Sequence, residues 1–330
     1  MITSVSFKNF RVLRDASIEL GPYNVVIGPN GSGKSTLLAA LKLLGLGSDL
    51  NAAQFRSVSD REGDNNFVVG MFIGDGRSSV GVRWVDTPRG VVFGRGPQLS
   101  SPGVSMWSEL QSVRIYSLDE RAIASAVPLQ PVIELAPDGA GLAGVLDRMR
   151  DENPEQFEAL NEEVARLLPE FDRILFDTPG AGMRSIKLRL RGGHGTIRAA
   201  DLSQGTLLAL ALLTIAYLPN PPAIIGIEEP DRGIHPRLYR DIQAALYRLA
   251  YPESFGLTRD PVQVIVTTHS PFLLDLHRDT PEEIIIAEKT GTGAEFHRLI
   301  DRPELTAILD DVSLGEAWYS GVLGGVPAGA

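Results

Sequence analysis

The chain has 330 residues, of which 43% are hydrophobic and 22% are charged, a size and composition that allow one large domain or two smaller ones. Its net charge of −10 argues against a uniformly basic nucleic-acid binder, and the lack of cysteine excludes disulfides and thiolate metal sites. We expect no membrane span and a cytoplasmic location, because no apolar run reaches about 18 residues and the N-terminus lacks a signal-peptide pattern.

The first part of the chain predicts strands that lead into a glycine-rich loop. Residues 1–27 alternate as two or three strands, and the last of these, over 23–27, is short and apolar. An apolar helix to about Leu44 follows the loop. The loop and helix start consist of Gly28, Pro29, Asn30, Gly31, Ser32, Gly33, Lys34, Ser35 and Thr36.

This run matches G-x-x-x-x-G-K-[ST], the phosphate-binding loop, in the required strand–loop–helix context. Glycines let backbone N–H groups approach an anion closely, and the helix N-terminus adds partial positive charge. We expect Lys34 to reach the β- and γ-phosphates of ATP and the Ser35 hydroxyl to bind Mg²⁺.

The middle of the chain predicts a meander and then a helical segment. Strand patterns over 67–73, 79–85 and 90–93 indicate an antiparallel meander. Helical periodicity over 139–168, interrupted at Asn153 and Pro154, is followed by strand patterns over 173–176 and 185–190.

The last third alternates apolar strands with helices. A strongly apolar helix ends near Leu218, and strands are expected over 223–227 and 262–267, with a helix over 235–249 between them. A hairpin over 283–287 and 296–300 completes the pattern. We therefore expect an α/β fold.

Two acids end the first of those strands. We expect Glu228 to hold Mg²⁺ and Glu229 to act as the general base that polarises the attacking water. The alternative is a strand that ends in solvated acids.

Two further segments resemble known ATPase motifs. Leu202, Ser203, Gln204 and Gly205 resemble the LSxG signature of ABC-type ATPases, in which a serine caps a helix that faces the γ-phosphate bound by a second subunit. His269, in the run Thr268 to Pro271, is similar to the switch histidine of that family. An ordinary helix cap and a turn histidine are the alternatives.

Together these motifs resemble the ABC-type ATPase heads of the RecF, SMC and OLD group. The resemblance implies a P-loop NTPase with a mixed sheet, an antiparallel β meander and an inserted helical signature lobe. It implies one lobe formed by residues 1–112 and 203–330, and an inserted lobe over 113–202. It also implies that two chains sandwich two ATP and Mg²⁺, and that Arg11 contacts the base or a phosphate.

The sequence departs from the family pattern at two points. Glu228 stands where many relatives have Asp, and the metal-binding glutamine loop has no Gln after the strand at 113–118. Asp119 or Glu120 is the candidate substitute. His235 stands where many relatives have an interface aspartate, which suggests a place at the dimer seam or simply the start of a helix.

The spacing between the motifs excludes some kinds of protein within this group. About 170 residues separate Lys34 from Ser203, which is too short for a long coiled coil, and about 60 residues follow His269, fewer than a nuclease domain needs. We expect an ATP-controlled homodimeric clamp or switch for a separate nuclease-like effector in DNA repair or phage defence. A non-hydrolysing ATP-sensing scaffold and, less readily, a transporter subunit are the alternatives.

Two surface features have open interpretations. Lys187, Arg189 and Arg191 share one strand face that either tracks a nucleic-acid backbone or is simply solvated. The segment 314–321 either docks a partner or packs Trp318 on the core.

Overall fold

The computed structural model describes residues 1–46, 68–74, 79–87, 90–95, 112–130, 132–291 and 293–324. The chain forms two compact units, and each is described by itself. Unit 1 comprises residues 1–115, 222–226 and 261–330, and unit 2 comprises residues 116–221 and 227–260. This division differs from the expected lobes, which assigned all of residues 203–330 to the lobe of the P-loop.

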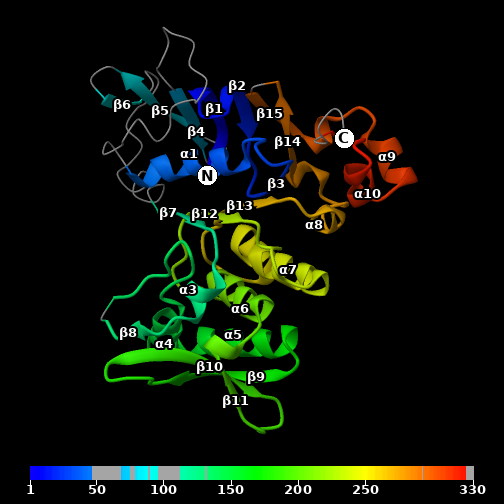
Figure 1. The fold of residues 1–330 in the computed structure, drawn as a ribbon. Coiled ribbons are helices and arrows are strands. Elements are labelled where there is room, and N and C mark those ends of the chain that lie inside the picture. The colour runs from blue at the N-terminus through cyan, green and yellow to red at the C-terminus, as the bar shows by residue number, and fades with distance from the viewer. Residues whose placement is uncertain are drawn as a thin grey trace. The chain divides into compact units, whose positions relative to one another are not determined.

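The central element of unit 1 is a six-stranded mixed sheet (Figure 1). Its order is β15-β14-β3-β13-β12-β7, with β3 parallel to both β13 and β14, and β14 antiparallel to β15. The strands are β3 (Tyr23–Ile27), β7 (Val113–Tyr116), β12 (Ile224–Glu228), β13 (Gln263–Thr268), β14 (Ile284–Thr290) and β15 (Gly293–Arg298). Every residue of β3 and β13 is buried, as expected for strands inside such a sheet.

The predicted meander forms a second, antiparallel sheet of order β2-β1-β4-β5-β6. Its strands are β1 (Ile2–Phe10), β2 (Leu13–Glu19), β4 (Val68–Gly74), β5 (Ser79–Thr87) and β6 (Gly90–Arg95). The strands therefore confirm the expected meander.

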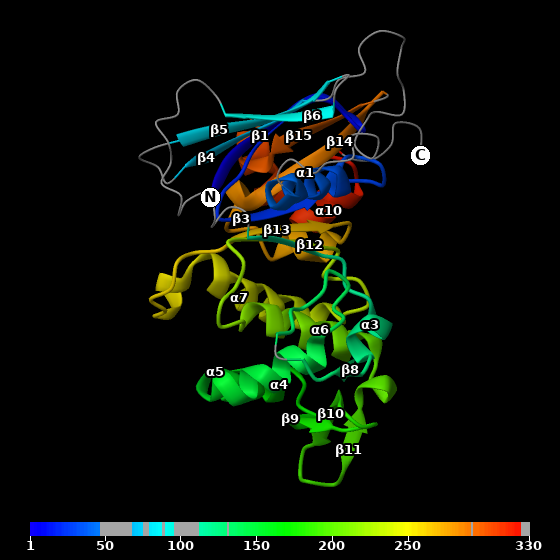
Figure 2. The same cartoon turned by 90° about the vertical axis from the view of Figure 1, so that its left-hand side faces the viewer.

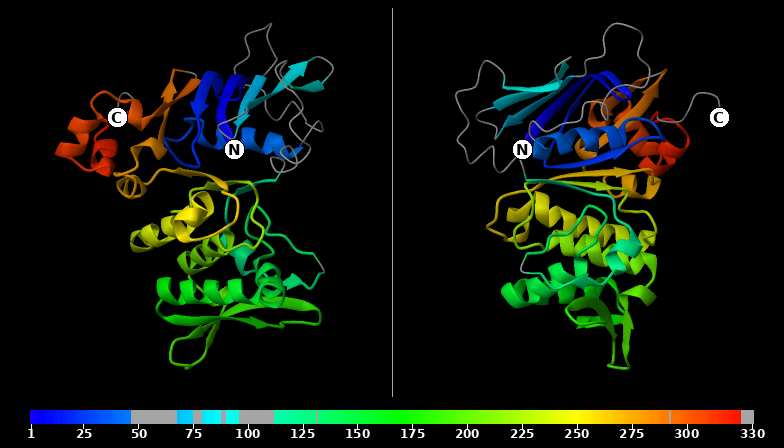
Figure 3. Two further views of the ribbon diagram at one scale, coloured as in Figure 1. Left: turned by 180° about the vertical axis from the view of Figure 1, so that it is seen from behind. Right: turned by 60° about the vertical axis from the view of Figure 1, so that its left-hand side comes forward.

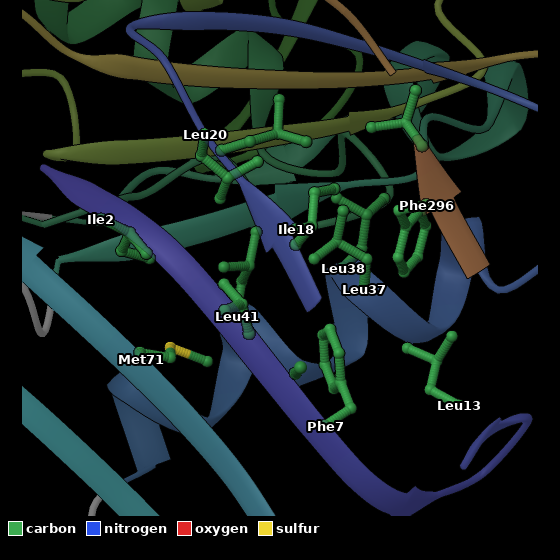
Figure 4. Close-up of a cluster of buried hydrophobic side chains, with 14 of the residues drawn as sticks. Ile2, Phe7, Leu13, Ile18, Leu20, Leu37, Leu38, Leu41, Met71 and Phe296 are labelled. Carbon is green, nitrogen blue, oxygen red and sulfur yellow. The ribbon is translucent and has the colours of Figure 1, made fainter. Parts of the chain in front are cut away.

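Helix α1 (Lys34–Leu46) lies between the two sheets (Figures 2 and 3). Its buried Leu37, Leu38 and Leu41 join the apolar face of β1 in one core, where Phe7 also contacts Phe296 of β15 with ring centroids 6.4 Å apart (Figure 4). This packing fixes the helix that follows the P-loop.

Unit 1 ends in short helices, α8 (Pro271–Asp275), α9 (Leu305–Asp311) and α10 (Leu314–Tyr319). The Gly315 N–H donates to Asp275 Oδ1 at 2.8 Å and so ties α10 to α8. Trp318 packs against a buried cluster that contains Ile286 and Leu314, which supports the core interpretation of this segment.

Unit 2 combines helices with a small antiparallel sheet in which β10 pairs with β8, β9 and β11. The expected break at Asn153 and Pro154 separates α4 from α5. The elements are α3 (Glu120–Ala124), β8 (Val127–Pro128), α4 (Leu142–Glu152), α5 (Pro154–Leu167), β9 (Phe171–Asp177), β10 (Met183–Leu190), β11 (Thr196–Arg198), α6 (Gln204–Ala216) and α7 (Tyr239–Ala250). In the described part of the chain, no helix combines the length and apolarity needed to cross a bilayer.

Candidate functional site

The P-loop connects β3 to α1 in unit 1. Gly31 and Gly33 have φ angles of 77° and 96°, a region that suits glycine and turns successive N–H groups to one side. The Lys34 ammonium donates to the carbonyl oxygens of Gly28 at 2.6 Å and Pro29 at 3.0 Å. The lysine therefore lies folded over the loop.

Ser32 gives the clearest indication of a ligand-binding position. The residue is 1% exposed, and its hydroxyl has no hydrogen-bond partner among the described residues. A buried hydroxyl without a partner is costly, so it marks a place where a ligand atom would be stabilised. The residues of the loop thus fit the phosphates of a nucleotide.

Close packing holds the loop from two sides. A Cβ on Gly28 would lie 2.5 Å from Ser32 Oγ and 2.9 Å from Ala287 Cβ, so only glycine fits there. A Cβ on Gly33 would lie 2.9 Å from Leu13 Cδ2, which places the start of β2 against the loop. Asn30 and Ser35 are exposed, whereas Thr36 is buried.

Arg11 lies in the turn between β1 and β2, two residues before Leu13. Both Arg11 and Asn9 have φ angles of 53°, which is uncommon for residues other than glycine. Phe10 between them is fully buried and anchors this strained turn in the core. Arg11 is therefore two residues from Leu13, whose side chain lies against the P-loop.

His269 follows β13, the parallel neighbour of the P-loop strand. Thr268 pairs with Ile27, so His269 and Gly28 leave adjacent strands at the same sheet edge. The Thr268 hydroxyl accepts from the Ser270 N–H at 2.9 Å and shapes the turn. His269 is half-buried.

The two acids belong to unit 2. Glu228 is the last residue of β12, and Glu229 has a φ angle of 47°, a strained conformation of the kind that clusters at functional sites. Both line a cavity of about 210 Å³ together with Ser117, Leu118, Leu208, Pro230 and Arg232.

Ser117 was not predicted from the sequence. It directly follows β7, the place where the glutamine loop was sought. The two expected substitutes have other roles, because Asp119 Oδ1 caps α3 by accepting from the N–H groups of Arg121 and Ala122, and Glu120 accepts from Gln204 at 3.5 Å. No local sequence pattern marks Ser117, because only the fold brings it beside Glu228 and Glu229.

The signature segment starts α6 in unit 2. Ser203 is the N-cap, and its Oγ accepts from the Thr206 N–H at 3.2 Å. Ser203 and Gln204 are exposed, and Gly205 is half-buried. The first residues of a 13-residue helix therefore lie at the surface, where the helix dipole gives partial positive charge.

The three basic side chains of this strand face have partners within unit 2. The Arg189 guanidinium lies 2.6 Å from Asp172, and the Lys187 ammonium lies 3.9 Å from Asp177. Arg191 lies beyond β10 and donates to the carbonyl oxygens of Ala165, Pro169 and Phe171. These contacts favour the structural interpretation of this face over backbone binding.

His235 is exposed, and its Nδ1 accepts from the Arg237 N–H at 3.2 Å. It therefore caps the short 3₁₀ helix that begins at Pro236, as the structural alternative expected. Its exposure also leaves it accessible to a second chain.

Comparison with known proteins supports the resemblance. Residues 113–275 match the family described as "AAA domain, putative AbiEii toxin, Type IV TA system", and residues 1–69 match "AAA ATPase domain". An OLD nuclease from Thermus scotoductus is 25% identical over 330 aligned residues, which cover 84% of this chain and 60% of that protein.

A DNA replication and repair protein RecF from Cronobacter sakazakii is 30% identical over 145 residues, which cover 43% of this chain and 35% of the relative. The matched part of the chain thus spans less than two thirds of the length of either curated relative. The fold is similar to the SMC head domain from Thermotoga maritima, with a TM-score of 0.52 and 16% identity over 90% of this chain and 98% of that domain.

Proposed function

We propose that this chain, whose relatives and motifs support an ABC-type ATPase head of the RecF, SMC and OLD kind, binds ATP with Mg²⁺ and hydrolyses it. The observation that carries this proposal is the P-loop itself. It combines a lysine folded onto its own loop with a buried serine hydroxyl that has no partner among the described residues.

Binding would exchange internal contacts of the loop for phosphate contacts. The Lys34 ammonium would leave the carbonyl oxygens of Gly28 and Pro29 for the β- and γ-phosphates, a charge-assisted interaction that is stronger than a neutral hydrogen bond. The Ser32 hydroxyl and the N–H groups of residues 31–36 would donate to the same oxygens. Arg11 would contact the base or a phosphate from the β1–β2 turn.

Hydrolysis needs a base and a sensor near the γ-phosphate. Glu229 would accept a proton from the attacking water, and the His269 imidazole would hydrogen-bond the γ-phosphate. Ser35 and Glu228 would hold Mg²⁺, which offsets the negative charge of the β- and γ-phosphates. Among the described residues, no cluster of three or more acidic or histidine side chains forms a metal site.

The nucleotide would be shared between two copies of the chain. Ser203, Gln204 and Gly205 present the exposed N-terminus of α6, which would meet the γ-phosphate bound by a second copy. The resulting homodimer would close with ATP and open after hydrolysis, as an ATP-controlled clamp. Because the relatives are named as a nuclease and a DNA repair protein, we propose that the clamp controls a nuclease-like effector in a DNA-related process.

A lysine substitution with a matched control tests nucleotide binding. Lys34→Ala should weaken ATP binding about 10- to 100-fold, because a charged hydrogen bond is worth about 1.5 to 3 kcal/mol. Lys42→Ala removes an exposed lysine from the same helix and should change the ATP dissociation constant less than twofold. Equal affinities of both variants, measured by calorimetry, would refute the proposal, and steady-state phosphate release by the wild type separates an ATPase from an ATP-sensing scaffold.

A further inference from the structure

The start of the signature helix touches the loop that carries Glu229, the proposed general base, within the same unit. We call residues 229–235, from Glu229 to His235, the acid loop. A Cβ on Gly205 would lie 2.8 Å from the carbonyl oxygen of Gly233 and 3.8 Å from the Cα of Ile234. Because a real Cβ does not approach a backbone oxygen so closely, the two backbones meet only if residue 205 is glycine.

From the other side, the contact involves the flexible side chain of Gln204. Gly233 has a φ angle of 78°, and a Cβ on it would lie 2.8 Å from Cδ and 3.1 Å from Cγ of Gln204. Two signature residues thus cover the backbone of Gly233. The segment predicted to face the nucleotide of a second copy is therefore packed against the acid loop of its own chain.

The acid loop is short and has internal backbone hydrogen bonds, so a displacement at Gly233 is transmitted to Glu229. The Arg232 N–H donates to the Glu229 carbonyl at 3.0 Å, and the Ile234 N–H donates to the Asp231 carbonyl at 3.2 Å. The buried side chain of Ile234 anchors the far end. The φ angle of 47° at Glu229 depends on this surrounding structure, because a non-glycine residue holds such a conformation only when its neighbours enforce it.

A second contact links the same helix to the acids. Leu208 lies one turn after Gln204 on α6 and lines the cavity that contains Glu228 and Glu229. The first two turns of α6 therefore touch both the acid loop and the wall of the acid cavity.

We propose that the contact between Gly205 and Gly233 couples the signature segment to the acid loop. A change in the position of the signature segment would therefore change the orientation of Glu229. Gly205 and Gly233 are positioning residues in this scheme. Its consequence for hydrolysis depends on the proposed function: when the signature segment meets the nucleotide of a second copy, the acid loop of its own chain is held in the geometry that aims Glu229.

The test measures the contact without nucleotide. Hydrogen exchange of peptides that cover residues 229–235 reports the N–H groups of Arg232 and Ile234. In Gly205→Ala these should exchange at least about tenfold faster than in the wild type, even though alanine is the better helix former. Gly256→Ala is the matched control in the same unit, because its φ angle is 68° but a Cβ would meet nothing within 4 Å; it should stay within twofold.

A second variant and a second readout complete the test. Gly233→Ala should also accelerate hydrogen exchange in the acid loop more than Gly256→Ala does. If Gly205→Ala fails to fold, the comparison of Gly233→Ala with Gly256→Ala still tests the inference. Gly233→Ala, which lies outside the segment proposed to meet the nucleotide, should lower kcat at least about tenfold while the ATP dissociation constant changes less than twofold. Unchanged exchange of the acid loop in folded Gly205→Ala and Gly233→Ala overturns the inference, whereas accelerated exchange in a protein whose wild type never hydrolyses ATP overturns only the proposed ATPase activity.

Discussion

Gln263 is a buried side chain whose replacement should destabilise unit 1 strongly. It is fully buried at the start of β13, and its amide makes three hydrogen bonds to backbone groups. Oε1 accepts from the Ile2 N–H at 2.9 Å, and Nε2 donates to the carbonyl oxygens of Ile2 at 2.7 Å and Gly21 at 2.8 Å. The side chain therefore fastens β1 and the turn before β3 to the strand that carries His269.

The expected size follows from those bonds. Gln263→Met keeps the approximate volume of the side chain but leaves the buried N–H and carbonyl oxygen of Ile2 without this partner, at about 1 to 2 kcal/mol each, whereas the part-buried Gly21 carbonyl still accepts from Asn24. The free energy of unfolding should fall by about 2 to 4 kcal/mol, a large part of the roughly 5 to 15 kcal/mol typical of a domain. With a urea m-value of about 2 to 3 kcal/mol/M, the midpoint should shift by at least about 0.7 M.

Urea titration followed by tryptophan fluorescence measures this shift, because Trp318 packs on a core cluster of unit 1. Gln130→Met changes an exposed glutamine of unit 2 and should move the midpoint by no more than about 0.2 M. A Gln263→Met midpoint within that same margin would refute the reasoning that these three bonds fasten the strands.

Two further changes test the P-loop packing and the burial of a titratable group. Gly28→Ala should reduce ATP affinity at least about tenfold in calorimetry, since its Cβ would meet Ser32 and Ala287, whereas Gly31→Ala, with φ of 77° and nothing within 4 Å of a Cβ, should show only the cost of strain, about 1 kcal/mol in stability. Equal losses of ATP affinity in Gly28→Ala and Gly31→Ala would contradict the packing argument. Burial, together with the charge of Glu163, raises the pKa of Tyr217 above its usual 10.0, so the native state favours the neutral phenol, and stability should be intact below about pH 10 and fall as the pH rises further. Tyr217→Phe should remove this alkaline loss, and an unchanged pH profile of thermal unfolding in that variant would assign the loss to other groups.

Local sequence patterns were sufficient for the elements whose chemistry is local. The glycine spacing, Lys34 and the apolar strand before them define the P-loop without any distant contact. The break at Pro154 separates two helices because proline lacks the N–H that would continue the first helix. The two-residue alternation in the first 20 residues likewise predicted β1 and β2.

Features that depend on distant contacts were missed or left open. Ser117 gains its place only because β7 ends beside the acid cavity, and no local pattern distinguishes it from other serines. The ion pairs of Lys187 and Arg189 depend on the register between β9 and β10, which a bulge shifts. The division into units also differs from the expected lobes, because β12 begins in one unit and ends in the other.

The central claim is that two copies close over ATP, each supplying one half of the site. Glu229→Gln keeps the size of the side chain but removes the base, so the variant should accumulate as an ATP-bound dimer with less than about 1% of wild-type turnover. Light scattering after size-exclusion chromatography, with and without ATP and Mg²⁺, measures the dimer. An ATP-dependent doubling of mass is the predicted result, whereas a monomer at saturating ATP, or normal phosphate release by the variant, would contradict the account.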